Sequence, residues 1–234
     1  MDRLTRKSLK TDKFAAEVGH TVEFLEEHRK QAIIAGVALL VVIVGAAGMY
    51  FHTKKQHAER QEALRNALAI FQAQISPTPN AVLTTFPTEE KRDEAVEKAF
   101  TGIVEKYPGS VESAIATYYL GVAAGNQGKE DEAEKRFREV IDSGKQPFAS
   151  QAALSLATLK ASLGDQEEAE KILRGLIEHP TVLVSKEQAT IALARILAGT
   201  NPSEARKLLE PLRGERSAVS RAALTALGEI GPAE

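Results

Sequence analysis

Two stretches of the sequence decide the fold: LGVAAGNQGKEDEAEKRF at residues 120–137 and LATLKASLGDQEEAEKIL at residues 156–173. They align without a gap at an offset of 36 residues. The landmarks that recur at this offset are Leu120 and Leu156, Gly128 and Gly164, Ala133 and Ala169, and Phe137 and Leu173. The same pair of a small and a large apolar residue returns once more, 36 residues on, at Ala205 and Leu209. Self-similarity at such a period is typical of a helical repeat array.

Each unit of the repeat predicts two antiparallel helices joined by a short turn. The predicted pairs are 111–127 and 129–143, 147–163 and 165–179, and 185–199 and 202–214. Glycines are expected to end the helices at Gly128, Gly144, Gly164 and Gly199. Asp165 is expected to cap the N-terminus of one second helix, and Asn201 with Pro202 that of another. Because one hairpin cannot bury its apolar face alone, the units must stack.

Further helices are expected on both sides of the three units. A degenerate unit precedes them, with helices at about 54–75 and 89–107. Three prolines predict a loop over 76–88, because proline cannot continue a helix or a central strand. A last helix at about 217–230 is expected to cap the open end through its alanines and Leu224, Leu227 and Ile230.

Residues 32–51, AIIAGVALLVVIVGAAGMYF, contain no charged residue. A helix of this length is roughly 30 Å long, which matches the hydrocarbon core of a bilayer. The sequence therefore predicts a transmembrane helix over about residues 31–52, followed by a connecting helix and the proline-rich loop over 53–88. The alternative is a cleavable signal peptide, for which the small residues 45–48 offer a cleavage site, although the apolar part of such peptides is usually shorter.

The N-terminal tail, residues 1–30, holds seven Lys and Arg, whereas the twenty residues after the apolar segment hold four. This bias predicts that the N-terminus lies in the cytoplasm and the large domain outside it. Phe14, Val18 and Leu25 are spaced as on one face of a short amphipathic helix, which would lie on the membrane surface, dock a partner or lead into the span.

The composition predicts no enzyme. The chain has no Cys, which excludes thiolate catalysis, disulfides and Cys-ligated zinc. Its five histidines lack metal-ligand spacing, it has no phosphate-binding glycine loop, and its net charge of -2 does not favour nucleic acid. We expect no catalytic residue, cofactor, metal site or small-molecule substrate.

Leu120, Gly121, Ala133, Phe137 and Val140 within one unit resemble the tetratricopeptide-repeat (TPR) motif, which pairs Leu-Gly in the first helix with a small and an aromatic residue in the second. The resemblance covers about residues 90–231 and implies an all-α solenoid of three to four hairpins with a capping helix, the repeat domain being 89–234. The period here is 36 rather than the usual 34 of the family, and the early Trp and Tyr are missing.

The layout of tail, single span and small repeat domain resembles that of the bacterial YfgM-like proteins. These are ancillary subunits of the Sec translocon with a periplasmic repeat domain and a role linked to chaperones. The resemblance implies a single-pass protein of the bacterial inner membrane with an extracytoplasmic repeat domain.

By the positions of the TPR family, the first helix of each unit contributes to an inner groove that binds apolar or helical segments of other proteins. The residues expected there are Ile115, Tyr118, Val122, Gln151, Leu154, Thr158, Gln188, Ile191 and Arg195. Alternatively, these residues pack against the capping helix or each other. Two functions remain open: a membrane-anchored scaffold that recruits proteins, for instance at the Sec translocon or with envelope chaperones, and a self-associating component of an envelope or cell-division assembly.

Overall fold

A computed structural model describes residues 29–77, 84–214 and 218–230. The chain divides into two compact units, Met1–Ala58 and Glu59–Glu234. The amphipathic helix expected in the N-terminal tail lies outside the described residues.

Helix α2, Arg29–Phe71, contains the apolar segment. In the first unit, the described side chains between Ile33 and Phe51 are exposed, because no other described element covers them. The helix is long and apolar enough to serve as a membrane anchor or as a signal sequence.

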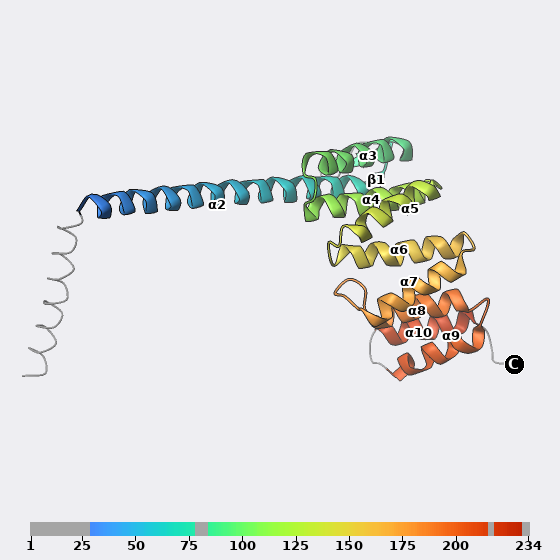
Figure 1. Cartoon of the computed structure of the whole chain (residues 1–234). Helices are drawn as coiled ribbons and strands as arrows, with labels where there is room; N and C mark the ends of the chain where they lie inside the picture. Colours follow the sequence, from blue (N-terminus) through green and yellow to red (C-terminus); the bar gives the residue numbers. More distant parts are fainter. Residues whose placement is uncertain (1–28, 78–83, 215–217, 231–234) are drawn as a thin grey trace, which may run out of the picture. The chain divides into compact units, whose positions relative to one another are not determined.

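The second unit is an array of helices that alternate in direction (Figure 1). After the C-terminal part of α2, they are α3 Glu89–Lys106, α4 Val111–Asn126, α5 Glu130–Asp142, α6 Phe148–Ser162, α7 Gln166–Glu178, α8 Lys186–Leu197, α9 Pro202–Leu209 and α10 Ala218–Glu229. Each lies within the range that the sequence predicts for it. The expected all-α repeat array is therefore confirmed.

Most helix ends follow the predicted chemistry. Gly128, Gly144 and Gly164 have positive φ after α4, α5 and α6, a conformation that glycine adopts without a steric penalty. The side chain of Asp165 accepts from the amide of Glu168, and that of Asn201 accepts from the amide of Glu204.

Three details differ from the sequence expectations. Gly199 does not have positive φ; α8 ends instead in a turn in which the carbonyl of Leu197 accepts from the amides of Thr200 and Asn201. The helix expected over 202–214 changes at Glu210 into the 3-10 helix Glu210–Gly214, because Pro211 has no N–H for an α-helical hydrogen bond. Leu224 is 49% exposed, because α10 buries Ala223 and Ala226 instead.

The proline-rich region adds the only strands in the described residues. The helix expected over 54–75 ends at Phe71, and residues 74–75 form a strand instead. This strand β1, Gln74–Ile75, pairs in parallel with β2, Thr85–Phe86. The amide of Ser76 also donates to the carbonyl of Phe86 at 2.8 Å. These bonds close the loop between α2 and α3 at its base.

Small residues let the two helices of each hairpin approach, and large ones fill the space to the next hairpin. Ala133, Ala169 and Ala205 are fully buried, as are Leu173 and Leu209. Among the described glycines, Gly121 leaves the least room for a side chain: a Cβ built on it would lie 2.8 Å from Cε1 of Phe137. In the next unit, Ala157 takes the position of Gly121 and shares a core cluster with the smaller Leu173.

Six aromatic side chains connect the first three hairpins. Phe100 of α3 is fully buried and stacks on Tyr119 of α4, with ring centroids 5.4 Å apart. Phe71 of α2 lies edge-on to both rings. From Tyr119 the chain of rings continues through Tyr118 to Phe137 and Phe148. The C-terminal part of α2 is thus part of the repeat core.

A second repeated feature lies on the exposed sides of α5, α7 and α9. Arg138 bonds Glu134, one turn back, and Glu168 of the next hairpin at 2.6 Å. Arg174, 36 residues on, bonds Glu170 and, at 2.8 Å, Glu204. These equivalent contacts tie successive second helices together, and we call them the arginine ladder.

Lys160 of α6 adds a cation to the first step of the arginine ladder, 2.8 Å from Glu134 and 3.2 Å from Glu168. Its ammonium, with Arg138, holds the pKa of Glu134 below the ordinary value. Arg138, with Lys160, lowers the pKa of Glu168.

The arginine ladder predicts an acid-sensitive contribution to stability. Because the pKa values of Glu134 and Glu168 are lower in the folded chain, their contribution is complete above the ordinary pKa of a glutamate, about 4.3, and is lost as the pH falls through the lowered values. We expect the double variant Glu134→Gln, Glu168→Gln to lose less of its free energy of unfolding between pH 7 and pH 3 than the natural chain. Denaturant titrations at both pH values measure this, and equal losses would contradict the prediction.

Candidate protein-binding groove

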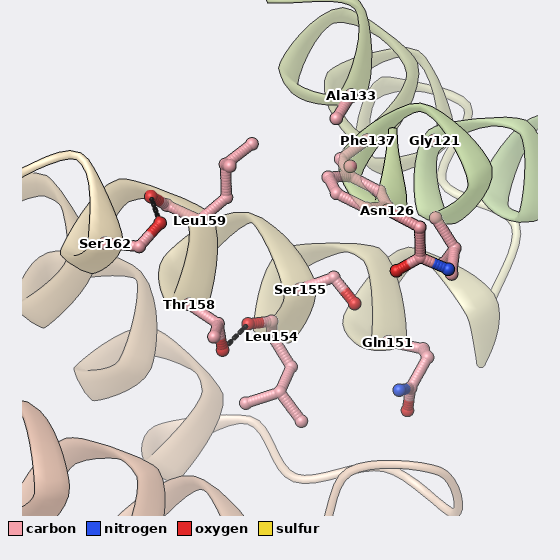
Figure 2. A pocket seen from close by; sticks show the side chains of 12 residues that line it. Gly121, Asn126, Ala133, Phe137, Gln151, Leu154, Ser155, Thr158, Leu159 and Ser162 are labelled. Atoms are coloured by element: carbon pink, nitrogen blue, oxygen red, sulfur yellow. Dashed lines mark hydrogen bonds between the residues drawn. The ribbon is translucent and has the colours of Figure 1, made fainter. Parts of the chain in front are cut away.

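A hollow of about 430 Å³ opens between α4, α5 and α6 (Figure 2). We call it the central hollow. Its lining residues are Gly121, Val122, Gly125, Asn126, Ala133, Phe137, Gln151, Leu154, Ser155, Thr158, Leu159 and Ser162. This volume falls within the range of pockets that hold a few side chains or a small ligand.

Helix geometry places these residues on one face. On α6, Gln151, Ser155 and Ser162 are separated by four and seven residues, which is one and two helical turns, and Leu154 and Thr158 lie between them, so they line one side of the hollow. On the other side, Gly121 leaves room for the ring of Phe137, which closes the hollow from α5. Figure 2 shows both sides.

The central hollow is uncharged. Each of the lining residues is apolar or carries a neutral hydroxyl or amide. The hydroxyl of Thr158 donates to the carbonyl of Leu154, and that of Ser162 donates to the carbonyl of Leu159. Such a surface favours an uncharged segment, because a charge that loses water here would find no opposite charge among the lining residues.

Two amides supply the directional groups. The side-chain N–H of Gln151 donates to the hydroxyl of Tyr118 at 3.3 Å, which leaves its carbonyl oxygen free to accept. The side chain of Asn126 is exposed and makes no hydrogen bond within the described residues. An amide both donates and accepts, which is what a peptide backbone requires.

The structure brings four of the nine predicted groove residues together: Val122, Gln151, Leu154 and Thr158 line the central hollow. Tyr118 lies beneath it, buried, with its hydroxyl 3.4 Å from Ser155 Oγ. Ile115 is half-buried on α4, and Gln188 is exposed on α8.

The capping helix covers the part of the groove that the third unit was expected to form. Ile191 is buried in the same core cluster as Ala223 and Ala226 of α10. Nε of Arg195 lies 3.4 Å from Oε2 of Glu229, also on α10. Arg195 therefore contacts the capping helix, and Ile191 lies in the core to which the capping helix contributes.

The sequence analysis assigned Ala133 and Phe137 to the packing of the repeat rather than to the groove, and it missed four further side chains of the central hollow: Asn126, Ser155, Leu159 and Ser162. Their spacing was a usable signal. Asn126 follows Val122 by four residues, and Ser155, Leu159 and Ser162 continue the stripe that begins at Gln151. Within the described residues, no group of three or more His, Asp or Glu side chains is placed to hold a metal ion.

Comparisons with known proteins address the fold. No family model matches the chain, and no curated protein matches it. Among solved structures, it is similar to a tetratricopeptide repeat protein from Parabacteroides merdae, with a TM-score of 0.51 and 16% identity over 73% of this chain and 59% of the other. The array has a TPR-like fold.

A second structure agrees with this result. The nearly identical TPR-like repeats of a kinesin light chain protein from Podospora anserina align with a TM-score of 0.51 and 15% identity, over 76% of this chain and 84% of the other. At these identities the likeness shows the fold alone. The TPR-like chain spans about three fifths of the length of the Parabacteroides protein.

Proposed function

We propose that the chain is a membrane-anchored scaffold whose TPR-like domain binds uncharged apolar or helical segments of other proteins, at the Sec translocon or with chaperones of the bacterial envelope. Stacked helical hairpins form concave surfaces that generally bind protein segments. The observation that carries the proposal is the uncharged central hollow, with amides at its edge and apolar side chains along its walls.

The apolar part of α2 supports an anchor rather than a cleaved signal. Its apolar segment of twenty residues exceeds the roughly 7–15 apolar residues that are usual in a signal peptide. Tyr50 and Phe51 at its end are the aromatic residues that anchor helices at a membrane interface. An anchor would confine the domain to the membrane surface, which raises its effective concentration for membrane-bound partners.

Fractionation tests the anchor. We expect the full chain to stay in the membrane pellet after extraction with alkaline carbonate, and a chain without residues 32–51 to enter the supernatant, because only the first has an apolar helix to bury in lipid. Protease added to spheroplasts, which expose the outer face of the inner membrane, is expected to digest the repeat domain. Release of the full chain by carbonate would exclude the anchor, and a protected repeat domain would reverse the proposed orientation.

The groove is tested by placing a charge inside it. Thr158 is exposed on α6, so Thr158→Lys leaves the core intact while it puts an ammonium into the uncharged hollow. We expect partners to bind at least about tenfold more weakly, because the lysine must lose water without gaining an opposite charge. Quantitative mass spectrometry of proteins that co-purify with the detergent-solubilised full chain measures this.

The matched control for this experiment is Leu224→Lys, which adds the same charge at an exposed position of α10, away from the lining residues. Proteins lost with Thr158→Lys but retained with Leu224→Lys bind the hollow. If both variants recover the same proteins in the same amounts as the natural chain, the hollow is not the binding site.

A further inference from the structure

The turn between α7 and α8 presents an apolar tip on a fixed backbone. The amide of Thr181 donates to the carbonyl of Val184 at 2.8 Å, and the amide of Val184 donates to the hydroxyl of Thr181 at 3.2 Å. The same hydroxyl lies 2.6 Å from Oγ of Ser150 on α6. Val184 is fully buried in the core. The conformation of the turn is therefore fixed by hydrogen bonds of Thr181 on one side and by the buried side chain of Val184 on the other.

At the tip of this turn, Val182 is 93% exposed, which makes it the most exposed large apolar side chain of the described residues, and its neighbour Leu183 is 38% exposed. A single exposed apolar residue is ordinary on a protein surface. Here, however, two lie side by side on a turn that is already ordered, so binding through them would lose little conformational entropy.

The charge pattern matches this turn to the central hollow. The seven residues 179–185, HPTVLVS, contain no Lys, Arg, Asp or Glu. Three other exposed large apolar residues of the repeat domain have such a charge within three positions: Val111 beside Glu112, Leu163 near Lys160, and Leu224 near Arg221. Ile75 has none, but it is only 44% exposed. Val182 therefore combines the largest exposure among these residues with an uncharged surrounding sequence, which is what the uncharged hollow favours.

We propose that the turn between α7 and α8 of one chain inserts Val182 into the central hollow of a second copy. The inference rests on the proposed function only in that the hollow is a docking site. The turn and the hollow are different surfaces, so the contact is head-to-tail and every copy carries one of each. The amide groups of Asn126 and Gln151 would meet the peptide groups of the inserted turn.

A contact through so small a tip requires a high local concentration, which a membrane anchor provides. The test therefore uses the full chain in lipid vesicles. Because the natural sequence has no Cys, single cysteines report unambiguously on the contact. Chains with Thr158→Cys and one affinity tag are mixed with chains carrying Val182→Cys and a second tag, and a short bismaleimide is added.

We expect the pair Thr158→Cys with Val182→Cys to give at least about ten times more cross-linked dimer than the control pair Thr158→Cys with Leu224→Cys. The control cysteine also replaces an exposed apolar residue. Adding chains without cysteine that carry both Val182→Glu and Thr158→Lys should not compete with this dimer, because both of their contact surfaces are altered, whereas adding the natural chain should. Equal yields from both pairs overturn the proposal. A product that joins mainly two Val182→Cys chains to each other also overturns it. If Thr158→Cys cross-links only to other proteins, the second-copy contact is excluded while the proposed function stands.

Discussion

Replacing Phe100 with alanine is expected to lower the free energy of unfolding by about 3–5 kcal/mol, the range found when a buried phenylalanine is removed. Phe100 is fully buried and contacts the rings of Phe71 and Tyr119. Its loss leaves a cavity between α2, α3 and α4 and removes a stacked aromatic pair. Denaturant unfolding of the full chain in detergent, followed by circular dichroism, measures the change.

The damage is expected to be local, because each hairpin of a solenoid contacts only its neighbours. Amide hydrogen exchange should accelerate in α3 and the C-terminal part of α2 and stay unchanged in α8 and α9. Phe148→Ala is the control, since Phe148 is only half-buried and should cost less. A uniform acceleration along the array would show that the domain unfolds as one cooperative body instead.

Replacing Gly121 with alanine is expected to destabilise the chain by about 1–2 kcal/mol, although alanine is the better helix former. The new methyl group would lie 2.8 Å from Cε1 of Phe137 and 3.1 Å from Cβ of Arg136. Overpacking of this kind costs about 1–3 kcal/mol, which exceeds the gain of up to about 1 kcal/mol in helix propensity.

The next hairpin, formed by α6 and α7, shows which second change would compensate for this overpacking. There, Ala157 and Leu173 take the places of Gly121 and Phe137. We expect the double variant Gly121→Ala, Phe137→Leu to be more stable than the sum of the two single changes predicts, and a double-mutant cycle measures the coupling. Strict additivity would mean that the two positions do not share one space. Gly125→Ala is the control, because a Cβ at Gly125 meets its nearest neighbour at 3.8 Å.

The repeat period in the sequence predicted the positions of the hairpins and of their turns. The 36-residue offset located the hairpins, because each unit must bury the same small and large residues against its neighbours. The resemblance to the TPR family, rather than the offset itself, placed Val122, Gln151, Leu154 and Thr158 in a groove, and these four residues line the central hollow. The turns at Gly128 and Gly164 followed from the same alignment.

The repeat period did not predict features that depend on contacts between residues far apart in the sequence. The pairing of β1 with β2 joins peptide groups across the proline-rich loop, and no side-chain pattern specifies such a contact. The rotation of α10 decided that Leu224 is exposed and that Glu229 meets Arg195. Residue spacing does not specify that rotation, so the contact of the capping helix with the third hairpin could not be predicted from spacing alone.

The arginine ladder has a consequence for how such a chain can grow. Arg138 reaches Glu168 and Arg174 reaches Glu204 over the same 30-residue separation. Helix α7 therefore carries both a glutamate that accepts from the preceding second helix and an arginine that donates to the following one. A duplicated module of 36 residues would meet compatible neighbours on both sides. The number of hairpins can therefore change by copying, without a new interface having to be invented.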